Sequence, residues 1–188
     1  MKNNGLRIAV RTALLLAIVT VFQMMRPLFL WDPTAAQIIV GSLVNLVLFV
    51  AAATVGWRGS IVVAVLTPFI AWLQSQIPHP LLIPFVALGN LALVLVFELV
   101  ERQSNKTARM LAGMGAAAVV KFIVLYLAVV QLFVPMILPG LGLKGQIANV
   151  LSLSFSWTQL VTAAIGGVVA FPVIKGLRRA LGKRSAEA

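Results

Sequence analysis

An apolar run from Met110 to Val134, in which Lys121 is the one charged residue, places the strongest constraint on this chain. A helix of about 20 residues crosses a bilayer, so the run is long enough to do so. Lys121 lies about 18 Å from Arg109 and about 20 Å from the far end, which its side chain cannot span. Because a charge in the bilayer costs about 2.5 to 3.5 kcal/mol, such a residue is expected to face protein or water and to mark a binding or transport site. A lysine that only bonds a carbonyl in a helix-packing seam is the alternative.

Composition agrees with a membrane protein. Of the 188 residues 61% are hydrophobic and 10% are charged, which is far from the balance of a soluble domain. The formal net charge of +11 does not indicate nucleic acid, because the basic residues cluster at the ends of apolar runs, where they set membrane orientation. The chain has no cysteine, which excludes a disulfide framework, a thiolate metal site and a cysteine nucleophile.

Apolar runs of membrane-spanning length recur along the whole chain, and no polar linker is long enough to separate two domains. We therefore expect an all-α, polytopic membrane protein of one domain, 1–188, with six transmembrane helices. The first run begins like a signal peptide, but no small-residue cleavage site follows, so we expect it to be retained. The spans are predicted at residues 6–25, 35–56, 60–77, 81–100, 110–134 and 155–174, followed by a basic tail at 175–188 that is amphipathic or frayed.

Short polar or proline-containing segments separate these spans. Trp57-Arg58-Gly59 is predicted to be a tight turn that sets the second and third spans antiparallel. Pro68, near the middle of the third span, predicts a kink or a break. Glu98 and Arg102 stand four residues apart in the order that favours a helical ion pair, which predicts a solvated end for the fourth span. The stretch 135–154 is expected to be a long loop.

Basic residues are distributed unequally between the two sides of the membrane. Six spans place both termini on the same side, and that side receives all of the 15 Lys and Arg residues except Arg26, Lys121 and Lys144. The positive-inside rule then makes both termini cytoplasmic. Most prolines fall at the other, outer ends, where they either stiffen loops over an outward-facing site or simply end helices.

The residues that catalysis or metal binding would need are scarce. The chain has one histidine, His79, and 4 acids: Asp32, Glu98, Glu101 and Glu187. No nucleophile, base and orienting group can be assembled, and His79 has no companion ligand at helical spacing. Gly140-Leu-Gly-Leu-Lys-Gly145 matches a dinucleotide-binding fingerprint in letters alone, because no strand precedes it. We therefore predict no enzyme activity, no catalytic residues and no metal site.

Depth in the membrane brings two polar residues to one level. The fourth span descends from outside, so Asn90 lies about nine residues in, and Lys121 lies about thirteen residues below the outer end of the ascending fifth span. If these helices pack antiparallel, the amide and the ammonium face one cavity. A cavity dominated by a cation and amides suits an organic substrate that carries a carboxylate. The further candidates for substrate contact are Gln159, Gln23, Arg26 and Trp31, the last of which is equally well explained as an interfacial anchor.

Small residues mark one face of the first span. Ala9, Ala13 and Ala17 recur every four residues, so they stack on one side of a helix and let another helix approach closely. This alanine face is predicted either to pack inside the protein or to meet a partner protein.

Five short segments stand in an order that is familiar from one family. They are Gly41-Ser-Leu-Val-Asn45, Leu66-Thr-Pro-Phe-Ile70, Pro84-Phe-Val-Ala-Leu-Gly-Asn90, Phe155-Ser-Trp-Thr-Gln-Leu160 and Thr162-Ala-Ala-Ile-Gly-Gly167. Together with the size, the six spans and the alanine face, they resemble the substrate-binding S components of energy-coupling factor (ECF) transporters over nearly the whole chain. Each segment is weak alone, and their order makes the resemblance specific.

This resemblance implies a subunit that captures a vitamin or another small micronutrient from outside, in the plasma membrane of a prokaryotic cell. The family's pocket lies toward the outer half, between spans one, four, five and six and the outer loops. The alanine face would dock onto a transmembrane T component driven by two cytoplasmic ATPases. Those partners would use the ATP, because this chain has no Walker A motif, and no cofactor is expected in it. No segment points to a particular vitamin.

Two other classes of function remain open at this point. A self-sufficient secondary transporter or channel for a small organic solute would carry an internal repeat with paired broken helices, of which Pro68 and Pro172 give a faint sign. A membrane scaffold would bind no metabolite at all.

Overall fold

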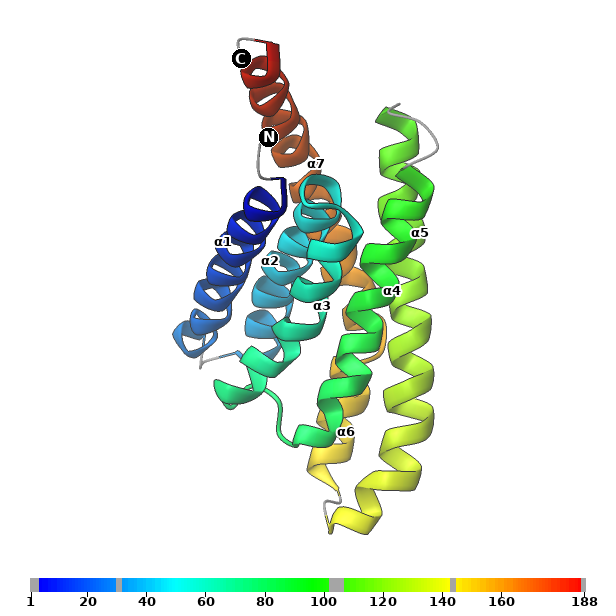
Figure 1. Cartoon of the computed structure of the whole chain (residues 1–188). Coiled ribbons are helices and arrows are strands. Elements are labelled where there is room, and N and C mark those ends of the chain that lie inside the picture. The colour runs from blue at the N-terminus through cyan, green and yellow to red at the C-terminus, as the bar shows by residue number, and fades with distance from the viewer. Residues whose placement is uncertain (1–3, 30–31, 102–106, 143–144, 187–188) are drawn as a thin grey trace.

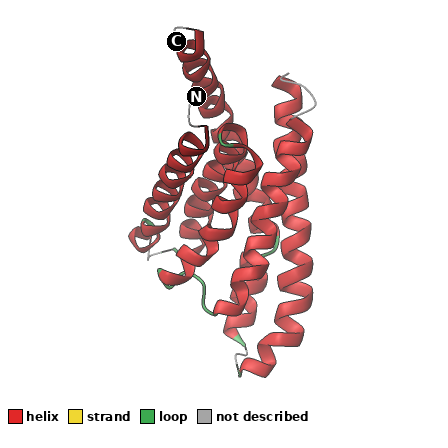
Figure 2. Ribbon diagram, in the orientation of Figure 1, coloured by secondary structure: helices red, strands yellow, loops and turns green. Residues whose placement is uncertain are grey.

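The computed structural model describes residues 4–29, 32–101, 107–142 and 145–186, and every regular element within these ranges is helical. Figure 2 shows the helices joined by short loops. Six helical runs are long and apolar enough to cross a membrane. The predicted all-α fold with six membrane spans is therefore confirmed.

The six long helical runs follow one another along the chain in alternating directions (Figure 1). The α-helices of the described residues are α1 (Asn4–Met24), α2 (Pro33–Thr54), α3 (Gly56–Leu73), α4 (Ile83–Glu101), α5 (Thr107–Leu125), α6 (Gln146–Ser154) and α7 (Trp157–Ala186). Between them lie shorter segments of tighter or wider helix, which are η1 (Arg26–Phe29), η2 (Pro80–Leu82), η3 (Tyr126–Ile137) and η4 (Leu138–Leu141). η3 is a π-helix that continues α5, and the other three are 3-10 helices.

Several boundaries differ from the predicted spans. The turn between α2 and α3 lies at Val55 and α3 begins at Gly56, so Trp57-Arg58-Gly59 belongs to α3. Gly56 has a φ of +72°, a left-handed conformation that a residue without a side chain adopts at little cost. The fifth helical run continues to Leu141, and α6 lies within the predicted loop 135–154, because a helix of 9 residues is too short to be recognised as a span. α7 carries the helix into the predicted tail as far as Ala186.

α2 lies in the interior of the bundle and α1 at its edge. In the most apolar stretch of α2, 56% of the residues are buried, compared with 22% in the corresponding stretch of α1. α1 is held by one narrow face, and its buried residues follow a three- and four-residue spacing: Thr12, Leu15, Val19 and Gln23. This spacing is that of a helix with a single packed side. The rest of α1 faces outward.

Two glycines allow the helices around the centre to approach closely. A Cβ at Gly166 of α7 would lie 2.7 Å from the Cβ of Asn45 on α2. A Cβ at Gly89 of α4 would lie 2.5 Å from Cγ of Leu125 on α5. Both distances are too short for any other residue without a shift of the helices. The two contacts bring α2, α4, α5 and α7 together around the middle of the bundle.

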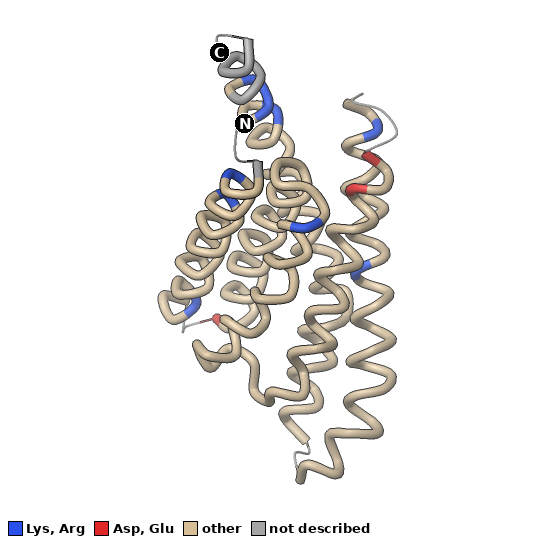
Figure 3. The backbone as a smooth tube through the Cα atoms, in the orientation of Figure 1, with Lys and Arg blue, Asp and Glu red and all other residues tan. Residues whose placement is uncertain are grey.

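Both ends of the described chain lie at the same end of the bundle (Figure 1). Figure 3 shows that most Lys and Arg positions gather at this end, while the opposite end carries few charges. Lys121 lies fourteen residues after the start of α5, about 21 Å along it, and therefore about half way through the bundle.

Candidate binding cavity

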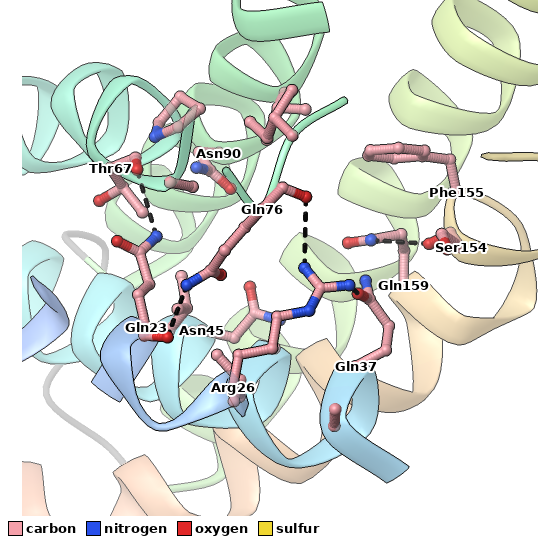
Figure 4. A pocket seen from close by; sticks show the side chains of 18 of the residues that line it. Gln23, Arg26, Gln37, Asn45, Thr67, Gln76, Asn90, Ser154, Phe155 and Gln159 are labelled. Carbon is pink, nitrogen blue, oxygen red and sulfur yellow. Dashed lines mark hydrogen bonds between the residues drawn. The ribbon is translucent and has the colours of Figure 1, made fainter. Parts of the chain in front are cut away.

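A cavity of about 170 Å³ opens between α1, α2, α3, α4, α5, α6 and α7. It is lined by polar groups from widely separated parts of the chain, among them Gln23, Arg26, Gln37, Asn45, Asn90 and Gln159 (Figure 4). Lys121 lines it as well. An apolar cavity of about 150 Å³ in another protein accommodates benzene, so this one has room for a compact metabolite. It reaches from the middle of the bundle toward the end opposite the termini.

Lys121 forms the inner end of this cavity. Its Nζ donates hydrogen bonds to Oδ1 of Asn45 at 2.6 Å and to Oδ1 of Asn90 at 2.8 Å. Both amide oxygens lie within hydrogen-bond distance of Nζ, and Lys121 is only 3% exposed. An ammonium has three donors, and the two amides occupy two of them. The third is available to a ligand.

A proline on a neighbouring helix fixes the orientation of Asn90. Pro68 lies inside α3 without ending it, so the helix is not broken there. Because proline has no N–H, the carbonyl four residues earlier, that of Ala64, lacks its usual helical donor. Nδ2 of Asn90 donates to this carbonyl at 3.3 Å, which turns Oδ1 of the same amide toward Lys121.

A second contact fixes Asn45 in the same way. Its Nδ2 donates to Oγ1 of Thr162 on α7 at 3.2 Å, and the Thr162 hydroxyl in turn donates to the carbonyl of Gln159 at 3.1 Å. The close approach of α7 at Gly166 brings these side chains within reach. Both amides around Lys121 therefore present an oxygen to it because their nitrogens are already bonded elsewhere.

Arg26 forms the other end of the cavity. Nη2 of its guanidinium donates to Oε1 of Gln37 at 3.2 Å, and Nη1 donates to the carbonyl of Gln76 at 3.4 Å. Gln76 follows Ser75, whose φ of +58° is rare for a residue with a side chain and reverses the chain after α3. Figure 4 shows Gln76 pointing inward, and its Nε2 also donates to the carbonyl of Gln23.

The remaining sequence candidates are distributed unevenly. Gln23 is buried in the cavity, where Nε2 donates to the carbonyl of Thr67 at 3.2 Å and Oε1 has no partner among the described residues. Gln159 lines the cavity, but its Nε2 is bonded to the carbonyl of Ser154 at 2.9 Å. Trp31 lies outside the described residues. The structure thus brings five of the six candidates to one cavity.

Sequence reasoning did not select Gln37, Asn45 or Gln76 as substrate contacts, although all three line the cavity. A signal for the first two was present, because Gln37, Gly41 and Asn45 are spaced by four residues and so share one face of a helix. Gln76 carried no such signal, since it reaches the cavity through the unusual backbone of Ser75.

The electrostatic character of the cavity is cationic. Arg26 and Lys121 line it, and no carboxylate does so among the described residues. Glu98 was expected at a solvated end, but it is buried, and Ser60 of α3 donates to it at 2.9 Å. Glu101 forms an ion pair with Arg178 of α7 at 2.9 Å. Both acids lie at the C-terminal end of α4, at the same end of the bundle as the two termini of the described chain.

The alanine face of α1 points away from the bundle. Ala9, Ala13 and Ala17 are all exposed, together with the neighbouring large residues Leu6 and Val10. The alternative in which these alanines pack inside the protein therefore does not agree with the structure. The face is available to lipid or to another protein.

Comparison with known proteins gives one match. A family model described as ECF transporter, substrate-specific component, matches residues 7–178. Searches of curated proteins and of solved structures gave no match. The matched range includes every residue of the cavity and the whole alanine face.

Proposed function

Because the chain belongs to the family of ECF transporter substrate-specific components, we propose that it captures a small carboxylate-bearing micronutrient, such as a vitamin, for an ATP-driven importer. Members of this family are the substrate-binding subunits of transporters, not enzymes. The family and the six apolar helical runs make the chain a multi-pass membrane protein. The nature of the substrate, the direction of capture and the partners are the parts that we propose.

The observation that carries this proposal is the environment of Lys121. Its ammonium is buried at mid-depth and held only by neutral amide oxygens of the described chain. A buried charge is costly without an opposite charge, and Arg26 adds a second cation to the same cavity. A carboxylate on the substrate would supply the missing negative charge and would accept the third N–H of Lys121.

Charge distribution supports capture from the outside. The end of the bundle that holds the termini gathers most of the basic residues, as the cytoplasmic side of a membrane protein does (Figure 3). The Arg26 end of the cavity then faces outward. We place the protein in the plasma membrane of a prokaryotic cell, with both termini in the cytoplasm.

The exposed alanine face supports docking onto a partner. Ala9, Ala13 and Ala17 would let a helix of a transmembrane T component approach α1 closely. Two cytoplasmic ATPases would bind that component and use ATP, because this chain has no Walker A motif of its own. Substrate capture and energy supply would then reside in different chains.

Native mass spectrometry of the mildly purified protein tests substrate capture. We expect a retained small molecule whose mass and fragmentation show a carboxylate. Lys121→Ala should reduce its affinity by at least tenfold, because the ligand loses its counter-charge. Retention of an uncharged molecule, or equal affinity in Lys121→Ala, would contradict the proposal.

Docking is tested with a pair of tryptophan variants on α1. Ala13→Trp should abolish uptake and copurification with the T component while the purified protein still binds its ligand. Leu14→Trp is the control, because Leu14 is 61% exposed and lies about 100° around the helix from Ala13. If both variants copurify as well as the parent, the alanine face is not the docking surface.

The alternative of a self-sufficient transporter gains no support from the helices. α3 and α7 continue through Pro68 and Pro172, whereas such transporters bind their substrate between paired broken helices. Uptake by the purified chain alone in liposomes, without ATPases, would nevertheless favour that alternative over ours.

A further inference from the structure

We propose that the substrate is a dianion, a compact molecule with an anionic group at each end and an apolar middle. This inference rests on the proposed function and goes further, because a single carboxylate would satisfy Lys121 alone. The cavity holds a second cationic group, the guanidinium of Arg26. The two cations bond to side chains at separate positions along one helix, α2.

α2 organises both ends. Gln37, Gly41 and Asn45 line the cavity at intervals of four residues, on one face of the helix. Gln37 accepts the hydrogen bond from Arg26, and Asn45 accepts the hydrogen bond from Lys121. Gly41, between them, presents no side chain. The helix therefore holds one cation at each end of a gap.

The face of α2 between these ends is apolar. Val40, Gly41 and Val44 line the cavity there, and Pro68 and Ala71 of α3 add apolar surface. Polar groups of a ligand that lie against this face would lose hydrogen bonds to water without replacing them. An apolar linker between two charged groups fits this surface.

Arg26 is poised to bind an anion and not merely to bond its present neighbours. Its hydrogen bonds to Gln37 and Gln76 measure 3.2 and 3.4 Å, longer than the 2.9 to 3.0 Å typical of N–H donors to oxygen. A guanidinium has five donors in a planar fork that matches a carboxylate with two parallel bonds. A carboxylate would therefore bind Arg26 better than the two neutral groups do.

Arg26 also lines a second hollow. Arg26 and Gln76 line a cavity of about 440 Å³, together with Met24, Pro27 and Gln74. These residues belong to the end of α1, to η1 and to the loop after α3. Arg26 and Gln76 line both hollows, so Arg26 lies where the two meet.

The spacing along α2 predicts the length of the ligand. Gln37 and Asn45 are eight residues apart, about 12 Å along the helix at 1.5 Å per residue. If the two cations are as far apart as the residues that they bond, and each contacts an oxygen at about 2.8 Å, roughly 6 Å remains between the two nearest anionic oxygens. A linear dicarboxylate of roughly four to seven carbons spans this distance at about 1.2 Å per bond.

Linear dicarboxylates of two to ten carbons test this inference on the full-length, ligand-stripped protein in detergent. We measure the midpoint of thermal unfolding and the affinity, beside monocarboxylates of the same carbon number. Stabilisation should peak between about four and seven carbons, and the best dicarboxylate should bind at least tenfold more tightly than its monocarboxylate. No stabilisation by any dicarboxylate, or equal affinity of the two series, would overturn the inference.

Substitutions of Arg26 test whether this end of the cavity binds the second anionic group. Arg26→Gln should remove the preference for dicarboxylates over monocarboxylates, and Arg26→Lys should retain part of it. Arg58→Gln is the matched control, because Arg58 is exposed at the start of α3 and does not line the cavity. An unchanged preference in Arg26→Gln would overturn the inference. A retained molecule with a single carboxylate would also do so, while leaving the proposed import of a carboxylate intact.

Discussion

Lys121 shows how a buried cation can be held without an acid. Asn45 and Asn90 each present an amide oxygen to it, and each amide is fixed by a bond from its own nitrogen. The charge is therefore supported by oriented dipoles, which is stable only while both amides keep their orientation. Removing one partner of a hydrogen bond to Lys121 should lower the free energy of unfolding more than replacing both partners with apolar groups. The reason is that a buried donor without an acceptor carries the full penalty of leaving water.

The variant Asn90→Leu tests this support directly. It leaves Lys121 with one acceptor, and we expect the free energy of unfolding to fall by about 1 to 3 kcal/mol. For a chain of this size that corresponds to roughly 2 to 4 °C per kcal/mol in thermal unfolding. Adding Lys121→Met to Asn90→Leu should recover part of the loss. A double variant that is less stable than Asn90→Leu alone would contradict the coupling.

Pro68 should influence ligand binding although it carries no polar side chain. Pro68→Ala supplies the N–H that bonds the Ala64 carbonyl, so Asn90 loses the partner of its Nδ2. We expect the affinity for the retained ligand to fall about fivefold, corresponding to about 1 kcal/mol. Calorimetric titration measures the change. Pro172→Ala on α7 is the control, since Pro172 is exposed and does not line the cavity, and an equal loss in both variants would argue against this role.

At the scale of elements, the contact between α4 and α5 sets the distance between Asn90 and Lys121. Gly89, beside Asn90, leaves no room for a side chain against Leu125, which is fully buried and packed beside Val129. Because Leu125 has little freedom to move away, a larger residue at position 89 must push the two helices apart. The hydrogen bond between Lys121 and Asn90 would lengthen as a result.

Gly89→Ala should therefore lower the free energy of unfolding by about 1 to 3 kcal/mol and weaken ligand binding. Gly115→Ala is the opposite case, because a Cβ at Gly115 meets nothing within 4 Å. Alanine is the better helix former by up to about 1 kcal/mol, so this control should be neutral or stabilising. Thermal unfolding of both variants measures the difference. Equal behaviour of the two would show that the α4–α5 distance is not fixed by Gly89.

Periodicity and length predicted the long helices, but they could not predict the features that shape the cavity. α6 is too short to stand out, and the left-handed backbone of Ser75 has no marker in its residue type. Helical rise alone fixes how deep a residue lies in the membrane, so the sequence was enough to place Asn90 and Lys121 at one level. The partnership of Asn45 with Lys121 depends on how α2 is rotated against α5, and that rotation is set by tertiary packing around Gly166 and Gly89.

At the scale of the whole molecule, orientation in the membrane is the untested prediction on which outward capture depends. The chain has no cysteine, so a single introduced thiol reports one position. Gly140→Cys should react with a membrane-impermeant maleimide in intact cells, and Gly5→Cys only after the cells are permeabilised. Both glycines are exposed with no neighbour within 4 Å of a Cβ, so neither change should disturb the fold. The reverse labelling pattern would place the cavity on the cytoplasmic side.

The neutral amides around Lys121 have a kinetic consequence. Were the ammonium held by a carboxylate, an incoming anion would have to displace a negative charge, and a departing one would wait for that charge to return. Asn45 and Asn90 are neutral, and both can stay bonded to Lys121 when an anion arrives at its third N–H. Binding then breaks no ion pair within the protein, and release breaks only the pair between Lys121 and the substrate. Under the proposed function, loading and release would need no exchange of acid partners at Lys121.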